Sequence, residues 1–323
     1  MKFRNQKLSR DVKVIGPTQL FTGLVTGITT LILLISGSVH AQGYIEGANM
    51  SYEFMPMKIE NAQEGQKFTA HNIKVGTTVP IFLKEDKSRY LLVGGNLEAF
   101  DFAGSHPDFE VDRVYSISPT FGYSTMLTKN FNLTALLMPT LNGDYKSVKV
   151  SDIKFGAVAR GSWKSSENLT WRITLGYRGQ FYGPQYIVLV GMDWKVNEKW
   201  RIFGDIPNNA TVSYGLNEKT NAGSNLFVQP TTYRLKNQER YFDYNTVNPG
   251  LFAERYIAKN WAIRATVAYT MVRNVEVYDK QDKTNGVIDF YDLSERAGPV
   301  NPEISKGLTF KIGLSYRIFP GKK

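Results

Sequence analysis

Residues suited to catalysis are few in this chain of 323 residues, which has no cysteine and only three histidines. Without cysteine there are no thiol nucleophiles, disulfides or cysteine-bound zinc sites. Ser105, His106 and Asp108 together supply the residue types of a hydrolytic triad. Triads are assembled from distant segments, however, and neighbours in one short run seldom reach the required geometry. We therefore interpret this run as a solvated loop.

His71 is the second candidate for catalysis. The apolar residues around it, Phe68, Ala70 and Ile73, change phase near this position, which predicts a β-bulge that could aim a functional side chain. A hydrolase that uses His71 is therefore kept as an alternative. Only two histidines follow residue 41 and no calcium-binding loop is found, so we predict no metal, no cofactor and no catalytic residue.

Arginine and lysine side chains that recur on one face of alternating segments carry the main functional hypothesis. In residues 168–182, apolar and aromatic side chains alternate with polar ones, and successive side chains of a strand point to opposite sides. Segments 261–271 and 308–318 repeat the pattern, and 151–163 shows a weaker version of it. The cations on the polar faces are Lys154, Arg160, Arg172, Arg178, Arg264, Lys311 and Arg317.

These cations would line an interior if the aromatic faces meet lipid. Charged residues inside a pore set its ion preference, so they predict a passive or anion-favouring channel for small solutes. The alternative is a closed, structural interior, because buried charges are normally paired. The acidic residues expected inside, which could neutralise the cations, are Glu53, Glu98, Asp152 and Asp193.

The alternating segments are long. Strands of soluble proteins have a most common length of about 5–6 residues, whereas a tilted membrane-spanning strand needs about 9–11. We therefore predict an all-β fold, an antiparallel transmembrane β-barrel, although a soluble sandwich also pairs an apolar with a polar face. If 200–206 and 210–217 are separate strands around Pro207, the count is 14, which we favour; if they are one kinked strand and 226–235 is a loop, it is 12.

Connections between the expected strands differ in length. Very short polar turns are expected at 128–130, 165–168, 197–199 and 258–260, whereas longer polar stretches span 102–112, 236–246 and 279–306. This asymmetry is typical of short periplasmic turns and longer external loops. Aromatic residues that follow the short turns, Phe131, Trp200 and Trp261, would lie at the membrane interface.

The N-terminal segment has the pattern of a secretory signal. Residues 1–19 are polar and basic, residues 20–39 are apolar and uncharged, and Ala41–Gln42 is the expected cleavage junction. We predict a signal peptide over 1–41 and the barrel over 42–323; a retained anchor helix is the alternative. Four of the ten excess positive charges belong to 1–41, and the rest are dispersed, so nucleic acid is not an expected partner.

The final strand, Gly307–Phe319, ends in Tyr316-Arg317-Ile318-Phe319. With the signal peptide and the amphipathic strands, it resembles the uncharacterised outer-membrane β-barrel families of Bacteroidetes-type Gram-negative bacteria. Pro320-Gly321-Lys322-Lys323 after the aromatic residue departs from that pattern. The resemblance implies an outer-membrane location, with outer-membrane lipid and the barrel assembly machinery as partners.

Three functions follow from the sequence, in order of preference. The first is the channel for small solutes, which makes the chain a non-enzyme. The second is a structural or surface-interaction barrel that acts through its external loops. The third is a barrel hydrolase. The sequence predicts no particular oligomeric state.

Overall fold

A computed structural model describes residues 44–60, 67–104, 109, 111–235, 239–288 and 291–319. The chain divides into two compact units, 1–37 and 38–323, and the described residues all belong to the second. The predicted signal peptide and the Ser105-His106-Asp108 run lie outside the described residues and stay predictions. No helix in the described part is long and apolar enough to cross a membrane.

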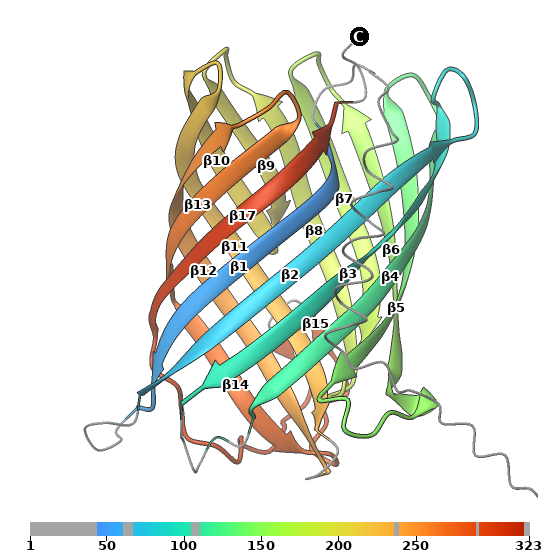
Figure 1. Ribbon diagram of the computed structural model, residues 1–323. Coiled ribbons are helices and arrows are strands. Elements are labelled where there is room, and N and C mark those ends of the chain that lie inside the picture. The colour runs from blue at the N-terminus through green and yellow to red at the C-terminus, as the bar shows by residue number, and fades with distance from the viewer. Residues whose placement is uncertain are drawn as a thin grey trace, which may run out of the picture. The chain divides into compact units, whose positions relative to one another are not determined.

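Fourteen antiparallel strands form a closed barrel wall in the described part of the chain (Figure 1). In order around the wall they are β1 (Ile45–Lys58), β2 (Lys67–Phe82), β3 (Arg89–Ala103), β4 (Arg113–Met126), β5 (Phe131–Gly143), β6 (Ile153–Lys164), β7 (Leu169–Gly179), β8 (Pro184–Lys195), β9 (Trp200–Ile206), β10 (Asn209–Asn217), β11 (Thr220–Leu235), β12 (Arg240–Tyr256), β13 (Trp261–Thr270) and β17 (Gly307–Ile318). Because β17 pairs with both β13 and β1, the sheet has no open edge there.

The remaining elements lie at one end of the barrel. β14 (Val272–Asp279) continues β13 along β12, β15 (Val287–Ile288) and β16 (Tyr291–Asp292) form a small hairpin, and η1 (Val150–Asp152) is a single 3-10 turn. The favoured count of 14 strands is confirmed. β9 and β10 are separate strands on either side of Pro207, and residues 226–235, the loop of the 12-strand alternative, belong to β11.

Alternation fixes the two faces of the wall. On β7, Trp171, Ile173 and Leu175 are exposed on the outside, whereas Thr174 between them is buried inside. β13 and β17 follow the same rule, with Val267 and Ile312 outside. Phe181, which was expected on the outer face, follows the end of β7 and is buried. The outer wall is therefore apolar over most of its strands.

Short turns gather at one end, here called the turn end, which is uppermost in Figure 1; the opposite end is the loop end. Side chains hold the short turns: Thr128 Oγ1 accepts from the backbone N–H of Phe131 at 3.0 Å, and Asn197 Oδ1 accepts from that of Trp200 at 2.9 Å. The loop expected over 236–246 is shorter than predicted, because β12 begins at Arg240.

At the loop end, parts of three strands leave the wall and form an inner layer, defined as residues 228–235, 240–247 and 272–279. Arg234 of β11 pairs in parallel with Gly143 of β5, and the backbone N–H of Asp144 donates to Arg234 O at 3.0 Å. β12 and β14 pair with each other beside it. The inner layer therefore crosses the barrel interior.

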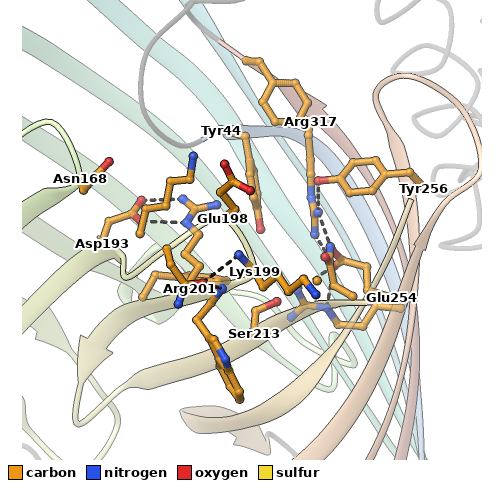
Figure 2. A pocket seen from close by; sticks show the side chains of 18 of the residues that line it. Tyr44, Asn168, Asp193, Glu198, Lys199, Arg201, Ser213, Glu254, Tyr256 and Arg317 are labelled. Atoms are coloured by element: carbon orange, nitrogen blue, oxygen red, sulfur yellow. Dashed lines mark hydrogen bonds and ion pairs between the residues drawn. The ribbon is translucent and has the colours of Figure 1, made fainter. Parts of the chain in front are cut away.

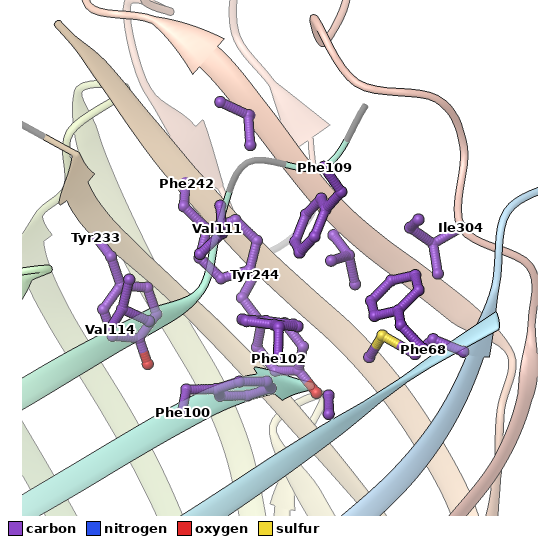
Figure 3. Close-up of a cluster of buried hydrophobic side chains, with 14 of the residues drawn as sticks. Phe68, Phe100, Phe102, Phe109, Val111, Val114, Tyr233, Phe242, Tyr244 and Ile304 are labelled. Atoms are coloured by element: carbon purple, nitrogen blue, oxygen red, sulfur yellow. The ribbon is translucent and has the colours of Figure 1, made fainter. Parts of the chain in front are cut away.

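One face of the inner layer packs on β1–β4 through an apolar core (Figure 3). Phe242 and Tyr244 contact rings from β3: the ring centroids of Phe102 and Phe242 lie 5.5 Å apart, and those of Phe100 and Tyr244 lie 4.7 Å apart. Edge-on and tilted contacts of this kind are favourable for aromatic pairs. This core occupies the interior between β1–β4 and the inner layer at the loop end.

The other face of the inner layer is covered by the connection from β14 to β17. Arg296 from that connection donates to Asp243 at 2.9 Å, and the Tyr241 hydroxyl donates to Asp282 O at 2.5 Å. The sequence predicts a loop over residues 240–246 because polar and aromatic residues occupy both faces of this segment. In the structure both faces of the segment are covered, so neither is an exposed polar face.

The bulge predicted at His71 is wrong. β2 pairs with β1 and β3 across this position without a register shift. The apparent phase change has another cause, since Phe68 and Ala70 point into the apolar core of the loop end, where the interior is no longer polar.

The wall is interrupted beside the inner layer. β8 pairs with β9 only over Val190–Lys195, and β11 pairs with β10 only as far as Phe227. β15 pairs with Gln185 and Tyr186 of β8, which leaves Ile187–Leu189 without a ladder partner on that side. We call this interruption the wall gap. The tip of the β9–β10 hairpin borders it on the side of the turn end, where Asn208 O accepts from the Val228 N–H at 2.9 Å.

Candidate functional site

A vestibule of about 730 Å³ lies inside the turn end (Figure 2). Its lining combines six cationic side chains with three carboxylates. The cations are Lys164, Lys195, Lys199, Arg201, Arg264 and Arg317, and the acids are Asp193, Glu198 and Glu254. The vestibule therefore carries a positive charge excess.

Glu254 on β12 is the centre of one ion-pair cluster. Arg317 Nη1 donates to Glu254 Oε1 at 2.8 Å and its Nη2 donates to Oε2 at 2.5 Å, while Arg264 Nε donates to Oε2 at 2.8 Å. Arg317 is also held by the Tyr256 hydroxyl at 2.6 Å and lies 4.1 Å from the ring centroid of Tyr44. Two guanidinium groups thus share one carboxylate in a bidentate arrangement typical of strong pairs.

Asp205 on β9 is the centre of a second cluster. Arg160 Nη2 lies 3.2 Å from Asp205 Oδ2, and Arg172 Nε lies 3.0 Å from Oδ1. Arg172 also donates to Met192 O at 3.0 Å. The carboxylate reaches this place because Gly191 has no side chain; a Cβ there would overlap Asp205 Oδ1. Again two cations share a single carboxylate.

The other predicted cations have different partners. Lys311 Nζ lies 2.9 Å from Glu53, which also accepts from Gln229 Nε2 at 3.0 Å. Lys154 Nζ lies 4.7 Å from the ring centroid of Phe181. Arg178 Nη1 donates to Pro230 O at 3.2 Å, and no ion pair involves Arg178 in the described part of the chain. On its strand, each of the seven predicted cations shares the phase of the buried side chains.

The acidic residues expected inside form a similar mixture. Glu98 lies 3.2 Å from Lys74, and Asp193 lies 2.6 Å from Arg201, which the sequence did not single out. Asp152 accepts from the backbone N–H of Lys149 at 2.8 Å. Asp205 and Glu254, each shared by two arginines, were missed, although Glu254 shares the inward phase of Phe252 and faces Arg264 in the register of β12 and β13.

A side cavity of about 360 Å³ lies between β5–β8 and the free edge of β11, beside the wall gap. Lys74, Arg160 and Arg178 line it, and no carboxylate does. A smaller cavity of about 100 Å³ shares Gln185 and Pro230 with it and continues to Arg296 in the loop-end connection. Polar cavities therefore follow one side of the inner layer, opposite the apolar core.

His71 faces the outside of the wall rather than the lumen. Its Nδ1 lies 2.7 Å from the Tyr52 hydroxyl and its Nε2 lies 3.0 Å from Thr69 Oγ1. Both partners are hydroxyls, whereas a hydrolytic histidine is oriented by a carboxylate or amide. In the part of the chain that the structure describes, no three His, Asp or Glu side chains gather closely enough to hold a metal ion.

Comparison with known proteins gives a family and a set of similar folds. The sequence profile of a family described as "Domain of unknown function (DUF6268)" matches residues 37–317. No curated protein matches the chain.

Similar solved structures include an outer membrane channel from Pseudomonas putida F1, at 10% identity, 88% coverage of this chain, 100% coverage of that chain and a TM-score of 0.43. The Pseudomonas putida toluene transporter TodX has 10% identity, coverages of 84% and 89%, and a TM-score of 0.40. The NanC porin has 8% identity, coverages of 83% and 98%, and a TM-score of 0.38.

Proposed function

This chain belongs to the DUF6268 family, and we propose that it is an outer-membrane channel that favours small anionic solutes. The observation that carries the proposal is the positive charge excess of the interior. Six cations and three carboxylates line the vestibule, and three cations and no carboxylate line the side cavity, where Lys74 and Arg160 are paired with acids outside the lining. Low-dielectric walls strengthen such a field and raise the local concentration of anions.

The outer surface supports the membrane location. Ile173, Val190 and Val267 belong to an exposed apolar face that covers many strands, and an exposed apolar surface of that extent is unfavourable in water. Trp163, Trp171 and Trp194 are exposed near the turn end, where an aromatic belt would contact lipid head groups. Delivery by a cleaved signal peptide and insertion by the barrel assembly machinery, with turns in the periplasm, belong to the same proposal.

The route of the solute follows the polar side of the inner layer. The apolar core between β1–β4 and the inner layer blocks the barrel axis at the loop end. On the polar side of the inner layer, the route begins at the vestibule and passes the Asp205 cluster. It then continues through the side cavity to the small cavity at Arg296, toward the loop end. Permeation along this side exposes an anion to Arg172, Arg160 and Arg178 in turn.

Planar-bilayer recording tests the proposal. Refolded full chain should conduct, and a KCl gradient should give a reversal potential of the sign for chloride preference. Reversing two vestibule lysines, Lys195→Glu with Lys199→Glu, should move the reversal potential toward potassium, because both line the cavity. The matched control is Lys84→Glu with Lys87→Glu, in the exposed β2–β3 turn outside the vestibule.

The control pair should leave the reversal potential unchanged. A folded protein that never conducts would refute the channel, and potassium preference in the unmodified protein would refute the anionic selectivity. Folding is checked on the same samples by the shift between boiled and unboiled protein in gel electrophoresis.

A further inference from the structure

Among the described residues, Arg178 differs from the other cations of the side cavity because no carboxylate pairs with it. Lys74 is paired with Glu98 at 3.2 Å and Arg160 with Asp205 at 3.2 Å, whereas Arg178 donates to the backbone carbonyl of Pro230. Placing a cation inside a protein without a compensating negative charge is unfavourable. The side cavity therefore contains a half-buried guanidinium group that an anion would neutralise.

The rest of the cavity lining is largely apolar, although none of its residues belongs to the apolar core of the loop end. Leu136 and Met138 come from β5, Val158 from β6, and Ile187 and Leu189 from β8. On β8 the run Ile187-Val188-Leu189-Val190 is apolar on both faces, whereas β7 next to it alternates strictly. Lipid contact explains Val188 and Val190 but not the inward residues of the same strand.

The wall gap places this apolar lining at the depth of the membrane. Ile187 and Leu189 belong to the stretch of β8 that has no β9 partner, and Val228 and Pro230 belong to the stretch of β11 that has no β10 partner. Val188 and Val190, on the outer face of the same part of β8, are 46% and 56% exposed. The apolar part of the cavity therefore lies at the level of the lipid-facing surface.

We propose that the side cavity binds a single-chain amphipathic anion, a medium-chain carboxylate, with its carboxylate on Arg178 and its alkyl chain along Leu136, Val158 and Leu189. A volume of about 360 Å³ is within the usual range for small-ligand sites, roughly 300–1,000 Å³. The binding site deepens the proposed channel function by naming the class of solute, and it rests on that function for the membrane position of the gap.

Calorimetric titration of the full chain in phosphatidylcholine nanodiscs tests the site, with empty nanodiscs as the blank for partitioning into lipid. The probes are hexanoate, octanoate and decanoate. Affinity should rise about fourfold for each added methylene, because each buries apolar surface, until the cavity is filled. Octanol and octylammonium should bind at least tenfold more weakly than octanoate, because they lack the negative charge that Arg178 would neutralise.

Two variants separate the head-group and chain contacts. Arg178→Gln should weaken octanoate at least tenfold and remove its advantage over octanol. Val158→Trp should fill part of the cavity and end the rise of affinity at a shorter chain. The control is Arg113→Gln, which removes an exposed guanidinium on β4 whose partner is Asp101, far in the sequence from the cavity lining.

Equal affinity for octanoate and octanol in the unmodified protein, or equal octanoate affinity in Arg178→Gln and Arg113→Gln, would overturn the site. Conductance of the same preparations separates the two proposals. Conductance without octanoate binding rejects the site and retains the channel, whereas binding without conductance rejects the channel and retains the site.

Discussion

Replacing Glu254 by glutamine should be among the most destabilising single changes in the barrel. The side chains of Glu254 and Arg317 are each only 3% exposed, and the carboxylate is shared by Arg317 and Arg264. Glutamine preserves the volume but removes the charge, so two guanidinium groups remain without a counterion. Removing one partner of a buried ion pair generally costs about 3–5 kcal/mol, because the remaining charge is left uncompensated.

The matched control is Asp101→Asn. Asp101 pairs with Arg113 at 2.6 Å, as close as the Glu254 contacts, but the two side chains are 41% and 54% exposed. Pairs in water contribute about 0–1 kcal/mol, because solvent screens the attraction. The two variants thus compare the same chemistry at similar distance and at different burial.

Reversible unfolding by guanidinium chloride in lipid vesicles, followed by tryptophan fluorescence, measures both changes. With a slope of about 4 kcal/mol per M, Glu254→Gln should lower the midpoint by about 1 M, whereas Asp101→Asn should lower it by at most about 0.25 M. Adding Arg317→Gln to Glu254→Gln should recover part of the loss, since one orphaned charge is then removed. If Glu254→Gln lowered the midpoint no more than Asp101→Asn, the burial argument would be refuted.

Three further outcomes are expected. Phe242→Ala, in the middle of the apolar core, should lower the free energy of unfolding by about 3–5 kcal/mol. The same change should raise the conductance along the barrel axis. An unchanged conductance would show that the core is not what blocks the axis. Gly183→Ala should lower the free energy of unfolding by about 1–3 kcal/mol, because Gly183 has a φ of 138° and a Cβ there would overlap Thr284 O. Gly298→Ala is the control: no atom lies near the position of its Cβ, so the same unfolding titration should show no measurable change. At the loop end, the Lys280 ammonium lies 2.7 Å from the exposed carboxyl of Glu239 and lowers the pKa of that carboxyl. The contact is therefore present above the usual glutamate pKa and is lost as the pH falls through the lowered pKa. An NMR titration should place the pKa of Glu239 below that of an ordinary glutamate, and Lys280→Met should raise this pKa; no difference between the two proteins would exclude the contact in solution.

The wall was predictable from the sequence because the alternation of apolar and polar residues within a strand identifies that strand's outer and inner faces. The apolar faces of β7, β13 and β17 can be identified from each strand's own sequence. Pro207 between two short alternating runs favoured two strands, β9 and β10, over the alternative of one kinked strand. The seven inward cations follow from the same phase.

The inner layer was not predictable in the same way. Alternation identifies a strand that has one polar face and one apolar face. Tyr241 and Phe242, by contrast, are both buried although they lie on opposite faces of β12. Partners were missed for a related reason, since Glu254 meets Arg317 and Asp205 meets Arg160 through contacts that cross strands not adjacent in sequence. Those contacts depend on where the barrel closes and on how far the inner layer bends.

The short β9–β10 hairpin also has a consequence for the bilayer. β9 has seven residues, which at about 3.3 Å per residue and a tilt of about 45° span only about 16 Å along the membrane normal. The apolar band of an outer-membrane barrel is about 25 Å tall, so this sector falls short by about 9 Å. Lipids around it must thin or tilt to cover the mismatch, which makes the sector beside the wall gap the place where the surrounding leaflet is most deformed.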